Sequence, residues 1–196
     1  MRHPLPEFPP LFPTGEWWRL RLKALLAGLT PEESIREANR ASLLKARDWM
    51  RFYVLGDRDD EVLLSVPVVH GASALKNAHP SSWRVDDDKP RCRKIDATLS
   101  TLYGKTPYFS FISPLLNVSQ FAGVKASEAC LAADKAIMEI LGLDNPSLIE
   151  SIKKTVATDK TASLPPLPCP DIKTLSVLDS LFKFGPQTIF ALIHSF

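Results

Sequence analysis

Residues 48–69, DWMRFYVLGDRDDEVLLSVPVV, carry the strongest β-strand signal in the chain. The stretches 48–55 and 61–69 are rich in β-branched and aromatic side chains, which favour strands. The polar residues 56–60 between them are typical of a turn. Together they predict a β-hairpin with a five-residue connection. Pro67 has no backbone N–H to donate, so the second strand lies at a sheet edge or ends near that proline.

Helical patterns flank the hairpin on both sides. Residues 16–26 form the first predicted helix, which stops at Gly28. Thr30-Pro31-Glu32-Glu33 begins a second helix that we expect to reach about Lys45, because a capping residue is followed by proline and then by acidic residues. Further helices are predicted over 92–103, 119–141 and 145–156, and in the tail 171–196, where Gly185-Pro186 forms a break.

These elements predict an α+β fold, a mostly helical single domain over residues 1–196 packed on a small mixed or antiparallel sheet. The proline-rich segment 1–14 precedes the first helix and can supply a third strand. A proline-rich linker over 158–170 leads to the C-terminal helices of 171–196. The long loop 71–91 is functional, mobile or hides a strand, because loops of that length are uncommon in compact domains.

The composition excludes several classes of function. The chain has 24 Lys and Arg against 22 Asp and Glu, a balance that provides no basic surface for bulk nucleic-acid binding. No apolar stretch is long enough to span a membrane or to serve as a signal peptide. The spacing of Cys92, Cys130 and Cys169 fits neither a zinc site nor a disulfide framework. We therefore expect a cytoplasmic protein with free thiols.

Common catalytic motifs are absent from the sequence. It contains no glycine-rich dinucleotide or phosphate loop and no serine nucleophile elbow, and it assigns no cofactor. The four histidines are scattered, and no pair has the spacing of a helical metal site. His70, which follows the second strand, is the best general-base candidate among them.

The charged cluster at residues 86–94 leaves two alternatives open. Asp86-Asp87-Asp88 either binds a cation or forms a solvated acidic loop. Arg91-Cys92-Arg93-Lys94 either binds a phosphate at a helix start or pairs with the neighbouring aspartates. Cys92 has a lowered pKa if it is exposed beside these arginines, but no base is adjacent to it in sequence.

Other polar and aromatic residues are candidates for ligand binding. Lys45 and Arg51 lie six residues apart and either clamp a phosphate or carboxylate or form an ordinary exposed pair. Trp83, Tyr103 and Tyr108 either stack against a sugar or base or fill the core.

Two further positions have simpler interpretations. Trp17 and Trp18 point about 100° apart on a helix, so we expect one in the core and the other along a groove. Asp179 is predicted to be a cap or a salt-bridge partner.

Several segments in order resemble the WbqC-like proteins of bacteria, from about Phe8 to Phe196. Each segment is weak alone, whereas their order and spacing are specific. The matching segments are Phe8-Pro9-Pro10-Leu11, Glu16-Trp17-Trp18, Lys45 with Arg51, Leu64-Ser65-Val66-Pro67-Val68, Trp83-Arg84, Tyr103 to Phe109, and Leu175 to Phe182 followed by Gly185-Pro186.

The sequence departs from the family pattern at two places. Trp49 replaces the first Arg of an Arg-Asn-Arg motif whose second Arg matches Arg51. A His that relatives carry between the matched Trp and Tyr is not recognisable after Trp83, where the Asp and Arg clusters are inserted. Where that His is catalytic in relatives, this departure implies lost or altered activity.

The resemblance implies a role in bacterial surface-polysaccharide (O-antigen) biosynthesis, because some family members occur with such enzymes. We expect a transferase-like enzyme that adds an acyl or aminoacyl group to an amino sugar or nucleotide sugar. In this hypothesis Lys45, Arg51 and Arg84 hold a phosphate or carboxylate of the small-molecule substrate, and Trp83, Tyr103 and Tyr108 stack on its ring. The alternative is a non-catalytic binding or assembly protein with the same fold.

Overall fold

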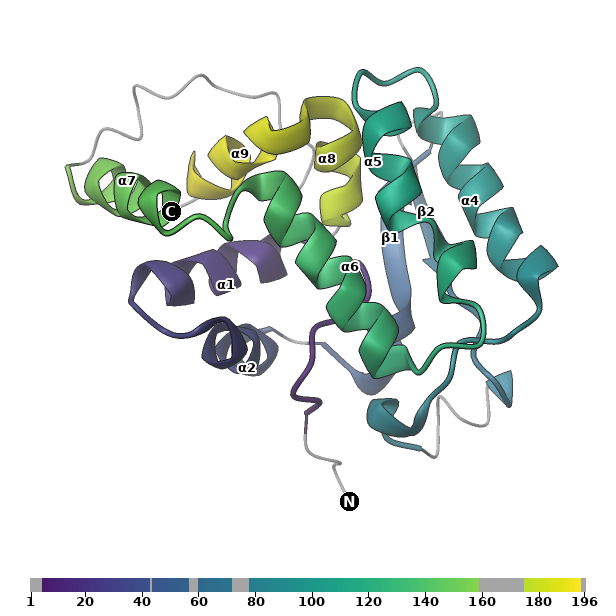
Figure 1. Cartoon of the computed structure of the whole chain (residues 1–196). Coiled ribbons are helices and arrows are strands. Elements are labelled where there is room, and N and C mark those ends of the chain that lie inside the picture. The colour runs from purple at the N-terminus through teal and green to yellow at the C-terminus, as the bar shows by residue number, and fades with distance from the viewer. Residues whose placement is uncertain (1–4, 43, 57–59, 72–77, 159–174, 195–196) are drawn as a thin grey trace.

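The computed structural model describes residues 5–42, 44–56, 60–71, 78–158 and 175–194 (Figure 1). Over this part of the chain the fold is mostly helical with a small antiparallel sheet, which confirms the predicted α+β class. In chain order the elements are α1 (Gly15–Leu26), α2 (Pro31–Ala41), η1 (Ala46–Met50), β1 (Arg51–Leu55), β2 (Glu61–Ser65), η2 (Pro80–Ser82), α4 (Lys89–Tyr103), α5 (Phe109–Leu116), η3 (Val118–Phe121), α6 (Ala126–Leu141), α7 (Pro146–Ala157), α8 (Val177–Phe184), η5 (Gly185–Gln187) and α9 (Thr188–His194).

The predicted hairpin is present, with shorter strands than the sequence indicated. β1 pairs with β2 in antiparallel register, from Arg51 opposite Ser65 to Leu55 opposite Glu61. β2 ends two residues before Pro67, as expected for a residue without an N–H. Residues 48–50, expected to begin the first strand, instead belong to the 3-10 helix η1, in which the Asp48 N–H donates to the Lys45 carbonyl.

The predicted bounds of two helices were wrong. α2 begins with the expected capping box at Thr30 but ends at Ala41, because Ser42 is already extended and the chain turns into η1. The predicted helix 119–141 is divided into η3 and α6. Between them the backbone of residues 123–124 pairs with Val85, which holds it out of a helix: Val85 N–H donates to Val124 O, and Gly123 N–H donates to Val85 O.

The remaining helices agree with the sequence more closely. α1, α4 and α7 coincide with the predicted ones to within a few residues, and α8 and α9 are separated at Gly185-Pro186 as expected. α5 was not among the predicted helices. Within the described part of the chain, no helix combines the length and apolar character needed to cross a lipid bilayer.

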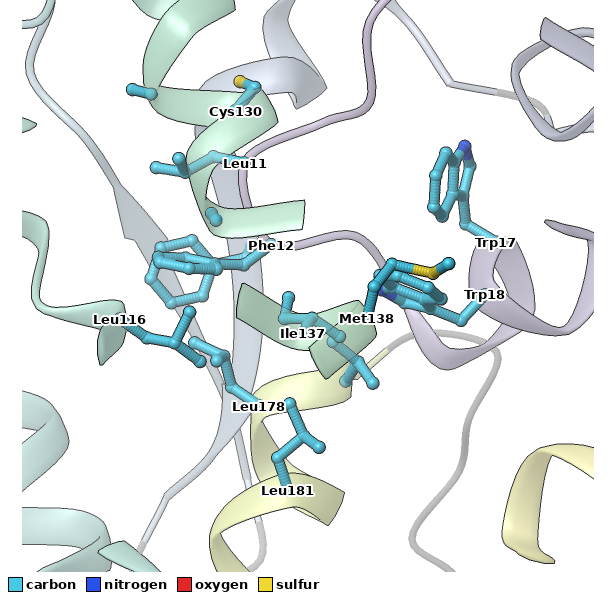
Figure 2. Close-up of a cluster of buried hydrophobic side chains, with 14 of the residues drawn as sticks. Leu11, Phe12, Trp17, Trp18, Leu116, Cys130, Ile137, Met138, Leu178 and Leu181 are labelled. Atoms are coloured by element: carbon cyan, nitrogen blue, oxygen red, sulfur yellow. The ribbon is translucent and has the colours of Figure 1, made fainter. Parts of the chain in front are cut away.

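One buried cluster joins helices from both halves of the chain, with α6 running through its centre (Figures 1 and 2). Both Trp17 and Trp18 are fully buried, so the expectation that one lines a groove was wrong. Their rings meet edge to face at 5.5 Å, which lets consecutive tryptophans share one core. Figure 2 shows Trp17 and Trp18 of α1, Ile137 and Met138 of α6, and Leu178 and Leu181 of α8 as members of this one cluster.

The proline-rich N-terminal segment packs against the beginning of α8. Thr14 forms an isolated antiparallel bridge with Ser176, so the third strand considered for this segment is reduced to a single bridge within the residues described. The Gly15 N–H donates to the Leu175 carbonyl at 3.1 Å, and the Val177 N–H donates to the Pro13 carbonyl at 3.0 Å. The predicted linker lies outside the described residues from position 159 onward.

The loop 71–91 also contains local structure. It includes η2, the beginning of α4 and two isolated bridges, Val68 with Val85 and Arg84 with Lys125. The bridges show that part of this loop makes strand-like contacts, which was one of the alternatives that its length suggested. Residues 72–77 lie outside the described part.

Candidate anion-binding pocket

A cavity of about 650 Å³ lies over the outer face of the hairpin, within the ~300–1,000 Å³ typical of ligand pockets. Three stretches of chain form it: the N-terminal segment, the residues around η1, and the two strands. Its lining residues are Pro10, Phe12, Pro13, Thr14, Leu44, Lys45, Arg47, Asp48, Arg51, Phe52, Tyr53, Glu61 and Leu63.

The N-terminal wall of the cavity is fixed by contacts with the core. The Leu11 N–H donates to the Trp49 carbonyl at 2.9 Å, and the Trp49 indole N–H donates to the Phe8 carbonyl at 3.1 Å. Phe12 packs edge to face on Phe52 with ring centroids 5.0 Å apart. Prolines at positions 10 and 13 restrict the backbone further. This wall is therefore held rigidly against the strand that carries Arg51.

The turn into η1 places two basic side chains at the rim. The Lys45 N–H donates to an Asp48 carboxylate oxygen at 2.8 Å, which fixes the turn. Lys45 and Arg47 are exposed, and the Arg47 Nε lies 3.7 Å from the other Asp48 oxygen. Asp48 therefore stabilises the turn, and the two basic groups line the cavity from the same segment.

Arg51 is the most informative residue of the cavity. It is half-buried at the start of β1, and its Nε is buried without a hydrogen-bond partner among the described residues. A buried N–H that lacks a partner costs about 1–3 kcal/mol, so such groups are usually satisfied by water or a ligand. Lys45, Arg47 and Arg51 give the cavity three basic side chains, against the carboxylates of Asp48 and Glu61.

Lys45 and Arg51, for which the sequence left open a clamp or an ordinary exposed pair, line the same cavity. The other candidate site residues do not line the cavity with Lys45 and Arg51. Trp83 and Tyr103 are each only 2% exposed and belong to the core cluster. The Tyr103 hydroxyl donates to Asp179 at 2.8 Å and accepts from the Leu55 N–H at 3.1 Å, and burial is the main reason why its pKa is raised.

Tyr108, Arg84 and His70 lie outside the cavity lining. Tyr108 is half-buried with its ring against Gly185, where an added Cβ would approach the ring to 2.5 Å. Arg84 is exposed, and its guanidinium donates to the Gly123 carbonyl at 3.0 Å. His70 is exposed and has a left-handed backbone with φ of +64°.

Of the lining residues, only Lys45 and Arg51 were site candidates from the sequence; among those missed are Arg47, Tyr53, Glu61 and Leu63. Strand alternation carried a usable signal for three of them. Side chains at every second position face the same side of a sheet, so Arg51 predicts Tyr53 beside it and the odd-numbered residues of the partner strand opposite. Arg47 follows Lys45 closely, but the sequence did not indicate the η1 turn that presents both.

In the charged cluster at 86–94, Arg91 pairs with the neighbouring aspartates, which was one of the two alternatives for the basic run. Arg91 lies 3.4 Å from Asp86 and 3.1 Å from Asp88. No group of three or more His, Cys, Asp or Glu side chains in the described residues is arranged to hold a metal ion. Cys92 is buried, so the condition for a lowered pKa is not met; burial raises the pKa of its thiol, and nearby carboxylates add to that effect.

Comparison with known proteins identifies the family. No curated protein and no solved structure matches the chain. The model of the WbqC-like protein family matches residues 42–166, which include the η1 turn, the hairpin, Lys45 and Arg51. That range covers more than half of the 196 residues. The chain therefore belongs to the WbqC-like protein family.

Proposed function

We propose that the chain is an enzyme of bacterial surface-polysaccharide biosynthesis that binds an anionic amino sugar or nucleotide sugar in this cavity. In this proposal it transfers an acyl or aminoacyl group to the sugar. The observation that carries the proposal is the gathering of Lys45, Arg47 and Arg51 around one cavity, together with the buried Nε of Arg51, to which no described residue offers an acceptor.

The three basic residues favour a phosphate or carboxylate over a neutral ligand. A guanidinium presents a rigid fork of N–H donors that matches two oxygens of such a group, and a lysine adds a compact charge. The Arg51 Nε–H, which has no hydrogen-bond partner among the described residues, gains one when the anion binds. The family membership of the chain supports the polysaccharide context, since some WbqC-like proteins occur with O-antigen enzymes.

The proposed reaction uses an acyl thioester or ester as the second substrate. The sugar amine attacks the acyl carbonyl, a C–N bond forms, and the C–S or C–O bond to the leaving group breaks. The amine loses a proton, and the leaving thiol or alcohol gains one. His70 lies outside the cavity lining, so in this proposal a carboxylate of the lining receives the amine's proton.

A binding screen tests the anion site. Thermal shift and calorimetry of the full chain are measured with nucleotide sugars, sugar phosphates, amino acids and acyl-CoA donors. A ligand at 100 times its Kd adds about 2.7 kcal/mol of stability, a shift of several degrees. We expect a sugar-linked anion to give this shift, and Arg51→Gln or Lys45→Gln to reduce it strongly.

Arg36→Gln is the matched control, because it removes the same charge from an exposed position of α2 outside the cavity lining. It should leave ligand binding unchanged. If the Arg51 and Arg36 variants behave alike, or if no anion of the panel binds, the proposed site is wrong.

One observation favours a second candidate function, a non-catalytic binding or assembly protein. Phe111 and Leu115 lie one turn apart on α5 and are 75% and 52% exposed, a combination common at protein contacts. The two candidates differ in turnover. Formation of an acylated sugar, detected by mass spectrometry and abolished in Arg51→Gln, supports the enzyme; ligand binding without product from any acyl donor supports the assembly protein.

A further inference from the structure

Along the outer face of the hairpin, a basic side chain, a pair of apolar side chains and an acidic side chain follow one another. Arg51 lies at the beginning of β1, Tyr53 pairs with Leu63 at the centre, and Glu61 lies opposite Leu55 beside the turn. Four of these five, all but Leu55, line the cavity. The intervening residues of the strands face the core, so the order is set by the pleat of the sheet.

The two charged ends of this face are well separated. Strands rise about 3.3 Å per residue, so the backbone of Glu61, opposite Leu55, lies about 13 Å along the sheet from that of Arg51. Lys45 and Arg47 belong to the η1 turn that leads into Arg51, and both line the cavity with it, so they add to the basic end. The cavity therefore has an end with three basic side chains, where Asp48 holds the η1 turn, and a far end with the Glu61 carboxylate.

The centre of the face is apolar and accessible. Tyr53 is 41% exposed and Leu63 is 44% exposed, and they are direct cross-strand partners. Such pairs stand with their Cβ atoms about 5 Å apart, which creates a continuous apolar surface. An exposed aromatic ring between two polar ends is suited to the C–H face of a sugar ring.

We propose that this order selects a phosphorylated amino sugar. The phosphate binds Arg51 and Lys45, the sugar ring packs on Tyr53 and Leu63, and the ammonium group pairs with the Glu61 carboxylate. This inference rests on the proposed function and deepens it, because it names the form of the sugar and makes Tyr53 and Glu61 determinants of specificity.

Calorimetric titration of the full chain at fixed ionic strength tests the assignment. The ligands are glucosamine 6-phosphate, N-acetylglucosamine 6-phosphate, glucose 6-phosphate and inorganic phosphate. We expect glucosamine 6-phosphate to bind about tenfold more tightly than the two sugars that lack an ammonium, as a charge-assisted contact implies. Because this comparison uses the unaltered chain, it is independent of whether a variant folds.

Two substitutions assign the contacts. Glu61→Gln should remove the preference for glucosamine 6-phosphate, whereas Glu128→Gln, at an exposed position of α6 outside the lining, should retain it. Tyr53→Ala should weaken all three sugar phosphates about tenfold and leave inorganic phosphate unchanged.

The outcomes separate this inference from the proposed function. Equal binding of the three sugar phosphates, or a Glu61→Gln effect that is the same for all of them, overturns the amino-sugar assignment, while dependence on Arg51 would still uphold the anion site. Binding that is indifferent to Arg51→Gln, or no binding at all, overturns both.

Discussion

Asp179 places a carboxylate in the core, fully buried at the first turn of α8. It accepts a hydrogen bond from the Tyr103 hydroxyl at 2.8 Å and pairs with Lys183 at 3.2 Å, which confirms the salt bridge expected from the sequence. The same hydroxyl accepts the Leu55 N–H. One phenol oxygen therefore joins α4, α8 and the end of β1.

Tyr103→Phe removes that oxygen and retains the ring, which packs on Phe182 with centroids 5.2 Å apart. We expect a loss of about 1–3 kcal/mol in the free energy of unfolding, since Asp179 and the Leu55 N–H each lose a partner in the interior. Urea denaturation measures it. Tyr108→Phe makes the same chemical change at a half-buried ring outside this network and should cost less; equal costs would contradict the assignment.

The stability of the chain should also respond to alkaline pH through Tyr103. Burial and the Asp179 carboxylate raise its pKa above the ordinary value of 10. A raised pKa contributes stability that is present below pH 10 and is lost as the pH rises further, because the unfolded chain then releases the proton first. The unfolding midpoint of the native chain should therefore fall more steeply above pH 10 than that of Tyr103→Phe.

At this scale the sequence placed some of its candidates in the cavity and others outside it, with Arg84 and His70 among those outside. Lys45 and Arg51 share a cavity because the short η1 turn and the beginning of β1 place them near each other. Trp83 and Tyr103 are aromatic residues that suit stacking on a ligand and packing in a core equally well. Long-range packing, which the sequence does not show, places both in the core.

At the scale of elements, a buried ion pair fastens α1 to α6. Arg21 of α1 bonds to the Asp134 carboxylate, and its Nε donates to Ser34 of α2 at 3.3 Å. The guanidinium also lies 4.8 Å from the Trp18 ring centroid. Burial raises the pKa of Asp134, although Arg21 opposes that effect.

Removing one member of this pair should be worse than removing both. Arg21→Met or Asp134→Leu alone leaves a buried charged group without its partner, at a cost of about 3–5 kcal/mol. The double variant should recover much of this loss, because apolar side chains of similar size fill the space. A double-mutant cycle in urea measures the coupling, and additive costs would show that the pair is not a unit.

The Arg21→Met variant should recover stability in acid. Without Arg21, the pKa of Asp134 rises further, since burial is then unopposed. A carboxyl with a raised pKa adds stability at a pH below its unfolded value of 3.8, and this contribution is lost as the pH rises through the folded value. The deficit of this variant relative to the native chain should therefore shrink as the pH is lowered, as followed by denaturant midpoints.

The contact between α5 and the end of α8 depends on a glycine. Gly185 has φ of +54°, and an added Cβ would lie 2.5 Å from the Tyr108 ring. Gly28 has φ of +93° with open space around it, which makes it the matched control. Gly28→Ala should cost about 1–2 kcal/mol in backbone strain, and Gly185→Ala about 1–3 kcal/mol more from crowding. In a Tyr108→Ala background that excess should disappear; if it persists, the ring is not its cause.

Element boundaries were predictable where capping chemistry is local. Thr30 and Asn145 begin α2 and α7 as their side chains indicated. The end of α2 was not predictable in this way, since Ser42 leaves the helix without a capping signal. The division of 119–141 was not either, because Val85 holds the backbone of residues 123–124 through contacts that sequence spacing does not reveal. The cavity shares this dependence, since long-range hydrogen bonds join its N-terminal wall to Trp49 of η1 and a ring contact joins it to Phe52 of the hairpin.

For the whole molecule, the α+β class followed from the scarcity of strand signals, whereas the meeting of the two ends of the chain did not. The segment before α1 bonds to the residues that begin α8, through Thr14 with Ser176 and Pro13 with Val177. Contacts between positions more than 160 residues apart leave no periodic pattern in a single sequence. They make the C-terminal helices part of the core that supports the cavity wall.

That arrangement makes the single-domain prediction testable by truncation after Thr158. Leu178, Leu181 and Phe182 of α8 are almost fully buried, as are Leu192 and Ile193 of α9. Fully burying each such side chain is worth about 1.5–3 kcal/mol, so their joint loss is comparable with the ~5–15 kcal/mol that stabilises a whole domain. We expect the fragment 1–158 to lack a cooperative thermal transition by calorimetry, and a peptide of residues 175–196 added in trans to restore one, since it supplies the missing apolar faces. A fragment that unfolds cooperatively within a few degrees of the full chain would instead show that the C-terminal helices are a separate unit.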